Sequence, residues 1–406
     1  MNIVLINRSD HLGGAAIASH RLMCALNDQG ADARMLVIDS NTHDGHVASV
    51  GSKWRNRYNF LAERLGIFLR NGMNRSTLFK IDTASHGLDL STHPWVKTAD
   101  VIILNWINQG MLSFKSLDQL LSLGKPVIWT MHDMWNCTGA CHHAYECRAY
   151  ETVCRSCPLM GKNGKDLSTT TQEAKARLYG AHNIHFVSVS NWLAQCCRNS
   201  ALLKNASLSV IGNPFPASEF PCHYEPGNLN LPQGTKVIVM GAARLDDPVK
   251  GFDLLIDAMN HIATHNPQLA SQLHLLLYGG LRDTSLLDDI ALPHTYVGYV
   301  DDVRPLYRQA HIVLSTSRYE SFGYTLVEGM SSGCVPVTTG DGGQVDIVKH
   351  LTNGYVTGSQ DAASIARGIE WAASCELTRE QLHEWVTVHF DSSIIAKQYL
   401  NLINNL

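Results

Sequence analysis

Residues 311–338 decide the fold class; they read HIVLSTSRYESFGYTLVEGMSSGCVPVT. A short apolar run ends at Ser315, and a glycine turn follows. An amphipathic helix begins near Gly323, and a second apolar run spans 335–338. This order of strand, turn, helix and strand is typical of a parallel sheet covered by crossover helices.

The same alternation runs through most of the chain, which predicts two doubly wound α/β units in tandem. In open parallel sheets, ligands bind at the carboxyl ends of the strands, so we expect the site in a cleft between two facing domains. One clear helical segment is 252–264. The expected strands are 2–7, 33–38, 100–104, 127–131, 185–189, 208–211, 236–240, 273–278, 311–315 and 335–338.

Length and proline content predict the domain boundary. The chain has 406 residues, about twice the commonest domain size. Five of its 13 prolines fall between Gly212 and Gly234, which marks a linker because proline prevents regular structure. We predict an N-terminal Rossmann-like domain at 1–213, a C-terminal Rossmann-like domain at 214–385, and a C-terminal helix at 386–406 that returns to the N-terminal domain.

Composition excludes several classes of protein. Hydrophobic residues make up 45% of the chain and charged residues 17%, and no window is long and apolar enough to span a bilayer. A net charge of -4 excludes a broadly basic nucleic-acid binder. The first residues look like a strand rather than a secretory signal, so we expect a cytoplasmic protein whose 11 cysteines stay reduced, bind metal or are simply buried.

Two glutamates flank the helix start near Gly323. Glu320 lies in the loop and Glu328 on the second turn, where they can reach a sugar and a ribose. A solvated helix face is the alternative explanation for such a pair. The backbone N–H groups at the start of the helix are suited to a pyrophosphate, because the first N–H groups of a helix have no intrahelical partner. These groups belong to Phe322, Gly323, Tyr324 and Thr325.

Two cations favour the functional interpretation. Residues 239–252, VMGAARLDDPVKGF, place Arg244 and Lys250 in the loop after a strand. Fixed cations stabilise the negative charge of a departing diphosphate without a metal. The chain contains no Asp-x-Asp pair, the usual carboxylate cradle for a magnesium-bound nucleotide sugar. We therefore predict metal-independent binding of a nucleotide diphosphate.

Together these motifs resemble the C-terminal domain of retaining glycosyltransferases of family 4, which have the GT-B fold. The resemblance covers Gly241-x-x-Arg244, Lys250-Gly251, Glu320-x-Phe322-Gly323-x4-Glu328, and Gly333 with Pro336 and Val337. It implies that Arg244 and Lys250 bind the donor phosphates, Glu328 the ribose and Glu320 the transferred sugar. It further implies retention of anomeric configuration with no cofactor in catalysis. Tyr278-Gly279-Gly280 departs from the family's commoner Val-Gly-x-Gly turn.

Two segments of the N-terminal half could serve the acceptor. The Gly13-Gly14 turn lets a phosphate or sugar approach the backbone, although a purely structural turn explains it as well. His132 follows the strand at 127–131 and could instead cap a turn. The family resemblance places the glycine loop against the donor diphosphate and His132 near the transferred sugar.

A cysteine cluster follows, at Cys141, Cys147, Cys154 and Cys157. Four thiolates within this span fit a structural zinc site, with reduced or partly disulfide-linked cysteines as the alternative. The block at 129–158 resembles a family-4 subgroup of polysaccharide, O-antigen and colanic-acid assembly, in which Trp-Thr-x-His-Asp-x-Trp precedes a cysteine cluster. Asn105 stands where that subgroup more usually has a histidine.

Residues 53–80 carry seven cations and one acid, Glu63, inside an acidic protein. Trp54, Tyr58, Leu61, Leu65 and Phe68 recur at helical spacing and form one apolar face. Such a helix can lie on an anionic membrane surface, or its apolar face can pack on its own domain with the cations in solvent.

The sequence thus predicts a retaining glycosyltransferase that moves a sugar from a UDP- or GDP-type donor to a glycan acceptor in cell-surface polysaccharide assembly, and we expect this acceptor to be lipid-linked. A nucleotide-sugar epimerase of the same fold or a non-enzymatic sugar-nucleotide binding protein is the alternative. A dinucleotide oxidoreductase is disfavoured, because residues 12–16 lack the Gly-x-Gly-x-x-Gly turn.

Overall fold

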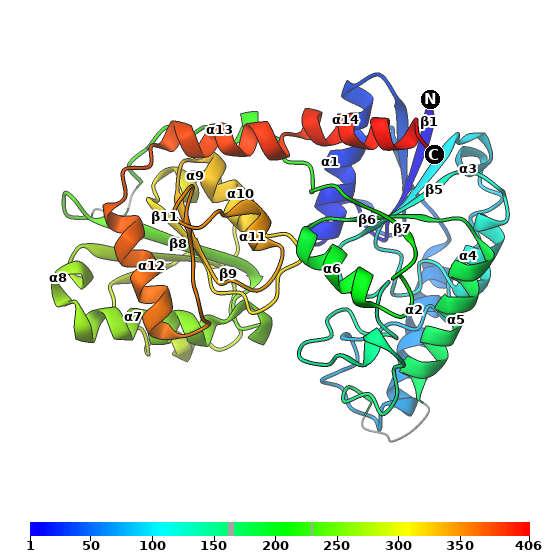
Figure 1. The fold of residues 1–406 in the computed structure, drawn as a ribbon, viewed down its shortest axis with the longest axis horizontal. Helices are drawn as coiled ribbons and strands as arrows, with labels where there is room; N and C mark the ends of the chain where they lie inside the picture. Colours follow the sequence, from blue (N-terminus) through cyan, green and yellow to red (C-terminus); the bar gives the residue numbers. More distant parts are fainter. Residues whose placement is uncertain (161–165, 228, 230) are drawn as a thin grey trace. The chain divides into compact units, whose positions relative to one another are not determined.

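The computed structural model describes residues 1–160, 166–227, 229 and 231–406. The chain forms two compact units (Figure 1). The first comprises Met1–Pro214 and Ser392–Leu406, and the second Phe215–Asp391. Positions 228 and 230 of the predicted linker lie outside the described residues.

The first unit contains a seven-stranded parallel sheet in the order β3-β2-β1-β4-β5-β6-β7. The order reverses between β1 and β4, which places the loops after these two strands at the switch point where α/β proteins bind ligands. The strands are β1 (Asn2–Ile6), β2 (Asp32–Val37), β3 (Val47–Ser49), β4 (Val101–Leu104), β5 (Val127–Met131), β6 (His185–Ser188) and β7 (Ser207–Val210).

Helices cover this sheet, and α14 closes its core. Ile395 and Tyr399 of α14 are buried in the cluster that also contains Met23 of α1 and Ile3 of β1, and α14 packs against α1 (Figure 1). The Tyr399 hydroxyl is 2.9 Å from Oγ1 of Thr130. The helices are α1 (Gly14–Asp28), α2 (Lys53–Arg70), α3 (Pro94–Thr98), α4 (Phe114–Leu121), α5 (Leu167–Ala181), α6 (Asn191–Asn199) and α14 (Ser392–Ile403).

The second unit contains a six-stranded parallel sheet in the order β10-β9-β8-β11-β12-β13, with its switch point between β8 and β11. Helix α7 packs with α12, and α10 packs with α13. The strands are β8 (Lys236–Arg244), β9 (Leu273–Gly280), β10 (His294–Tyr296), β11 (Ile312–Ser315), β12 (Val335–Thr338) and β13 (Tyr355–Val356). The helices are α7 (Phe252–His265), α8 (Pro267–Ala270), α9 (Arg304–Arg308), α10 (Tyr324–Ser331), α11 (Gln344–Ile347), α12 (Ala362–Ser374) and α13 (Arg379–Phe390).

The two parallel sheets confirm the predicted α/β class. The sequence missed β3, β10 and β13, which are short strands at sheet edges with half-exposed side chains and so lack a strong apolar pattern. Two helices, α13 and α14, stand where one C-terminal helix was expected at 386–406, and the chain passes back into the first unit after Asp391. None of the helices in the described ranges combines the length and apolar character that a membrane crossing requires.

Truncation of Ile395 on α14 tests how the core of the first unit closes. Ile395→Ala should lower the free energy of unfolding by about 2–4 kcal/mol, because a fully buried side chain leaves a cavity. Lys397→Ala, on the exposed side of the same helix, should change it by less than about 0.5 kcal/mol. Urea unfolding of both variants measures the difference, and equal effects would show that α14 does not complete this core.

Candidate functional site

Lys250 and Glu320 meet at the carboxyl edge of the second sheet. Lys250 ends the 3-10 turn that follows β8, and Glu320 lies in the loop between β11 and α10. Nζ of Lys250 is 2.8 Å from Oε2 of Glu320. The carboxylate raises the pKa of Lys250, so the lysine stays charged. Both side chains are half-buried, which leaves this pair accessible to a ligand.

Hydrogen bonds to the backbone fix the loop after β8 to the loop after β11. Oγ1 of Thr316 donates to the carbonyl oxygens of Lys250 and Gly251, at 2.9 and 2.8 Å. The N–H of Arg318 donates to the carbonyl of Val249 at 2.8 Å. Gly251 has φ 64°, and a Cβ there would lie 2.2 Å from the Thr316 carbonyl oxygen. The glycine of the Lys250-Gly251 motif is therefore required by close backbone approach.

A third loop, after β12, also supports Glu320. The sequence analysis did not predict a role for this loop. The N–H of Gly343 donates to the Glu320 carbonyl at 2.6 Å. Gly342 has φ 125°, and a Cβ there would lie 2.5 Å from the same oxygen. The signal was present in the run Gly-Asp-Gly-Gly at 340–343, directly after a strand. The loops after β8, β11 and β12, which are neighbouring strands in the sheet, thus together hold Glu320 in place.

Glu328 lies on α10 at the end of a chain of hydroxyl groups. The Tyr307 hydroxyl donates to Oε2 of Glu328 at 3.1 Å, and the Tyr278 hydroxyl is 2.6 Å from that of Tyr307. Burial raises the pKa values of both tyrosines, so they remain protonated donors. A Cβ on Gly241 would overlap the Tyr278 ring, which explains a glycine at 241. No sequence pattern links Tyr307 to this site.

The side chains of Arg244 and Phe322 make contacts other than the Lys250–Glu320 ion pair. Nε of Arg244, an exposed residue, is 3.1 Å from Oδ1 of Asp246, so its ion pair is made outside the Lys250–Glu320 contact. Phe322 is buried against Phe390, with ring centroids 5.6 Å apart, and thus helps to anchor the loop through its side chain. Gly323, at φ 111°, is the N-cap of α10, while Tyr324 and Thr325 form its half-exposed first turn.

In the first unit, His132 and Asn105 lie together at the carboxyl edge of β5 and β4. Nε2 of His132 is 3.1 Å from Oδ1 of Asn105, which accepts its proton in the tautomer protonated at Nε2. Burial lowers the pKa of His132 to about 4, so the ring is neutral at pH 7. Asn105, the residue that departs from the subgroup pattern, therefore orients this histidine.

A buried ion network holds the segment that carries His132. His142 lies between two carboxylates, with Nδ1 2.8 Å from Oδ2 of Asp133 and Nε2 2.7 Å from Oδ2 of Asp82. Burial alone would lower the pKa of His142, but the two carboxylates raise it to about 10. Nε1 of Trp106 also donates to Asp133, at 2.9 Å. The residue next to His132 is thus fixed by a charged imidazolium and an indole.

Helix α2 joins the same network through its buried face, which corrects one prediction. Arg64 was counted among the solvated cations of 53–80, but it is buried and ion-paired with Asp82. Its neighbour Glu63 is also buried, and burial together with the charge of Asp82 raises the pKa of Glu63 to about 7. Oε1 of Glu63 accepts from the Thr83 N–H at 3.1 Å.

Lys175 on α5 pins the loop that follows His132. It is fully buried, donates to the carbonyl of Trp135, and lies 3.1 Å from the carbonyl oxygens of Thr138 and Gly139. Its Nζ also lies 3.6 Å from the centroid of the Trp135 ring. Burial lowers the pKa of Lys175 to about 7. This loop therefore has a fixed backbone although it lacks regular structure.

The Gly13-Gly14 turn opens α1 at the switch point. Gly13 has φ 87° and is the N-cap of the helix, and both glycines are exposed. Asp10, just before the turn, is bonded to the hydroxyls of Ser40 and Thr42, each at 2.8 Å. Burial alone would raise the pKa of Asp10, but hydrogen bonds from His11 and Thr42 lower it. The turn is thus preceded by a fixed, ionised carboxylate.

The four predicted zinc ligands are not gathered at ligand distance. Among the described residues, the only group of at least three metal-ligating side chains within 4.8 Å of one another is His20, Cys24 and Asp44. Burial raises the pKa of Cys141 to about 12 and that of Cys154 to about 11, which keeps both thiols protonated. A structural zinc at Cys141, Cys147, Cys154 and Cys157 stays a prediction, and it requires these thiols to come closer together than they lie in this structure.

The imidazolium of His142 should make stability pH-dependent. Its pKa is raised on folding, so its contribution is complete below pH 6.5 and is lost as the pH rises towards 10. His142→Gln should lower the free energy of unfolding by about 3–5 kcal/mol at pH 6, and by less at pH 9. Urea unfolding at several pH values measures this trend.

His182→Gln is the matched control, because His182 pairs with the exposed Asp118 at 2.7 Å. Because Asp118 is exposed to solvent, this pair contributes at most about 1 kcal/mol, and the variant should stay near wild type at each pH. If the His142→Gln effect were constant from pH 6 to 9, the imidazolium bridge would be excluded.

The second unit is similar in sequence to a known protein family. Residues 226–386 match the family of glycosyl transferases group 1. An uncharacterized glycosyltransferase of Methanocaldococcus jannaschii is 33% identical over 128 residues, 30% of this chain and 32% of that protein. The N-acetyl-alpha-D-glucosaminyl L-malate synthase of Bacillus anthracis is 28% identical over 163 residues, 38% of this chain and 40% of that protein. The chain thus matches well under half the length of these relatives.

A solved structure extends the likeness to the whole chain. The Anabaena protein HepE, in complex with UDP and glucose, is similar with a TM-score of 0.64 and 16% identity, covering 100% of both chains. At this identity the likeness shows the fold, which is the two-domain GT-B architecture. The chain therefore has the GT-B fold, and its residues 226–386 are similar to the glycosyl transferases of group 1.

Proposed function

We propose that this protein is a retaining glycosyltransferase that transfers a sugar from a UDP- or GDP-type nucleotide donor to a glycan acceptor. The observation that carries the proposal is the fixed Lys250–Glu320 pair at the carboxyl edge of the second sheet, in the part of the chain that matches the family. A neighbour of the same fold is described in complex with UDP and glucose, which supports a nucleotide-sugar donor.

In this proposal the second unit holds the donor. Lys250 neutralises the diphosphate and exchanges part of its contact with Glu320 for the ligand. The first turn of α10, at Tyr324 and Thr325, offers backbone N–H groups to the phosphates. Glu328, oriented by Tyr307, accepts hydrogen bonds from the ribose hydroxyls. Arg244, at the end of β8, would add a second cation to the donor site once its side chain leaves Asp246.

Charge development explains why cations serve catalysis here. Negative charge grows on the leaving diphosphate in the transition state, and a fixed ammonium stabilises that charge without a metal. Glu320 contacts the transferred sugar, and the leaving phosphate helps to take the acceptor proton. His132, neutral because its pKa is lowered to about 4, can accept a hydrogen bond from a sugar hydroxyl.

A donor screen tests the reaction class. The full chain is incubated with UDP-, GDP- and dTDP-sugars and with defined glycan and lipid-linked glycan acceptors. Transfer with a retained anomer, unaffected by EDTA, is the expected result. Interconversion of free nucleotide sugars would instead show an epimerase, and binding without turnover in any combination would show a binding protein. An inverted anomer would overturn the retaining mechanism.

Variants of the donor residues test their roles. Lys250→Ala and Glu328→Ala should each reduce kcat/KM for the donor by about 10²-fold or more, because charge-assisted contacts are lost in the site. Arg304→Ala is the matched control, since its partner is the exposed Asp302 in the same unit. Wild-type kinetics in the Lys250 and Glu328 variants would refute the assignment.

We further propose that α2 rests on an anionic membrane surface, as suits a lipid-linked acceptor in cell-surface polysaccharide assembly, with the protein peripheral at the inner face of the cytoplasmic membrane. Five large apolar side chains of this helix are exposed, while its polar residues Glu63, Arg64 and Asn59 are buried together with Ile67. The exposed fraction of Trp54 is 84%. The other exposed apolar residues of the helix are Tyr58, Leu61, Leu65 and Leu69.

Exposed charge on α2 favours an anionic bilayer over a neutral apolar partner. Lys53, Arg55, Arg57 and Arg70 are exposed, and the acid of the helix, Glu63, is buried. Each cation near an anionic surface adds about 1 kcal/mol of attraction, and the aromatic rings suit the interfacial region. This arrangement, with an outward apolar face and flanking cations, is that of an interfacial helix.

Co-sedimentation with anionic phospholipid vesicles measures this interaction. Trp54, Leu61 and Leu65 changed together to Ser should abolish binding, and Lys53, Arg55 and Arg57 changed together to Glu should weaken it more at low salt than at high salt. Tyr299→Ser, an exposed aromatic of the second unit, should bind like wild type. Unchanged binding of both α2 variants would exclude this surface.

A further inference from the structure

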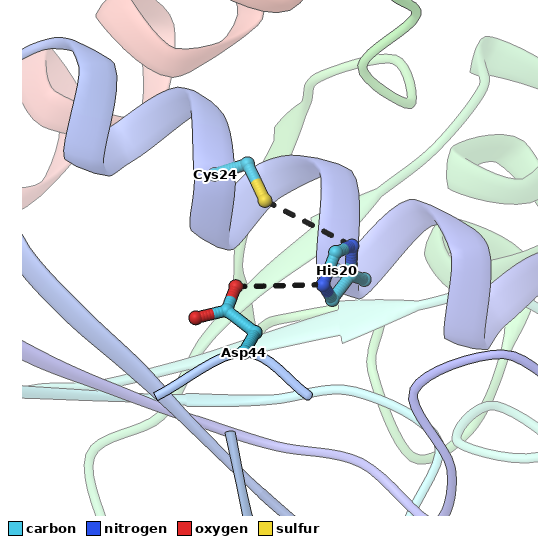
Figure 2. Close-up of side chains that lie close together, drawn as sticks. All are labelled: His20, Cys24 and Asp44. Carbon is cyan, nitrogen blue, oxygen red and sulfur yellow. Dashed lines mark hydrogen bonds and ion pairs between the residues drawn. The ribbon is translucent and has the colours of Figure 1, made fainter. Parts of the chain in front are cut away.

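We infer that His20, Cys24 and Asp44 form a binding site for a divalent transition metal, separate from the donor residues and from the cysteine cluster at 141–157. His20 and Cys24 lie one turn apart on α1, and Asp44 comes from the loop between β2 and β3 (Figure 2). One ligand atom from each residue lies within 4.8 Å of the others.

The distances suit an ion that sits among these three side chains. Nδ1 of His20 is 3.8 Å from Sγ of Cys24, and Nε2 is 3.8 Å from Oδ2 of Asp44 (Figure 2). These separations are near those between ligands of a tetrahedral zinc ion, for which metal–ligand bonds are about 2.0–2.3 Å. A small rotation of the imidazole brings one nitrogen to the ion.

Nε2 of His20 provides an independent reason for a ligand. This atom is buried and has no hydrogen-bond partner among the described residues. A buried polar atom without a hydrogen bond costs about 1–3 kcal/mol, so a metal bond to Nε2 would remove an existing penalty. The imidazole thus gains more from an ion than a solvated histidine would.

His46 orients the carboxylate of Asp44. Oδ1 of Asp44 accepts from the N–H of His46 at 2.8 Å and lies 3.0 Å from its Nδ1, while Oδ2 faces His20. A second residue that orients a metal-binding carboxylate is usual in metal sites.

The donor set selects the kind of ion. Imidazole, thiolate and carboxylate together suit Zn²⁺ or Co²⁺ rather than Mg²⁺ or Ca²⁺, which prefer oxygen ligands. Binding converts the Cys24 thiol to a metal-bound thiolate and releases one proton to solvent. Three protein ligands leave a fourth position for water.

The site would fasten a loop to the helix that begins at Gly14. Asp10 already holds this loop at Ser40 and Thr42. A metal at Asp44 would hold it again, against the second turn of α1. The loop would then be held at Ser40 and Thr42 by Asp10, the residue shortly before the Gly13-Gly14 turn, and at Asp44 by the metal.

Metal titration of the full chain tests the inference and needs no enzymatic assay. Protein stripped with EDTA is titrated with Zn²⁺, and separately with Co²⁺, whose thiolate complexes absorb in the near ultraviolet. His20→Ala, Cys24→Ser and Asp44→Asn should each lose one equivalent of bound metal or weaken it by at least about 10-fold. The cobalt–thiolate absorption should fall in Cys24→Ser.

Two controls separate this site from other ligands of the chain. Cys154→Ser with Cys157→Ser should keep the equivalent assigned to His20, whatever it does to the cysteine cluster. His261→Ala with His265→Ala removes a stacked histidine pair on α7, whose ring centroids are 4.1 Å apart, and should also keep that equivalent. Circular dichroism checks that each variant is folded.

Two outcomes would overturn the inference. One is wild-type stoichiometry and affinity in folded His20→Ala and Cys24→Ser proteins. The other is loss of all bound metal in the Cys154 and Cys157 double variant alone. Neither outcome bears on the donor site, whose failure would appear in the sugar-transfer assay instead.

Discussion

All strands of a parallel sheet end at the same edge, and this constraint gathers the candidate donor site. Lys250, Glu320 and the glycines at 342 and 343 follow three different strands, yet hydrogen bonds join them within one local structure. The Lys250–Glu320 contact is possible because Thr316 bonds both loops to each other. Glycine at 251 and 342 is needed because backbone approaches backbone too closely for a side chain.

Burial of charge explains the unusual surface of the first unit. Asp82 and Asp133 are paired with one imidazolium, and Arg64 completes the pairing from α2. A buried ion without a partner is costly, so the helix must turn its polar face inward. Its apolar face is then left outside, where Trp54 and Leu65 are exposed. The same network that fixes the segment carrying His132 thus creates the surface proposed to meet the membrane.

Apolar periodicity predicted the fold, and strand-end positions predicted which residues would approach each other. Lys250 and Glu320 are 70 residues apart, but both follow central strands and so had to lie at one edge. The edge strands β3, β10 and β13 escaped prediction because half-exposed positions carry no clear pattern.

Partners set by tertiary contact could not be read from the sequence. No pattern in the sequence pairs His142 with Asp82, because their contact spans 60 residues of chain. Arg64 looked solvated because helical spacing shows which residues share a face, but not which face is buried. Tyr307 reaches Glu328 only because β8, β9 and β11 bring α9 and α10 together.

The central claim is that the loops around Lys250 bind a nucleoside diphosphate. The most direct measurement is the calorimetric affinity of the full chain for UDP, GDP and dTDP, each compared with its monophosphate. One diphosphate should bind at least about 10-fold more tightly than its monophosphate, and Lys250→Ala should remove that advantage. Equal affinities for diphosphate and monophosphate in the wild-type protein, or an advantage that survives in Lys250→Ala, would contradict the account.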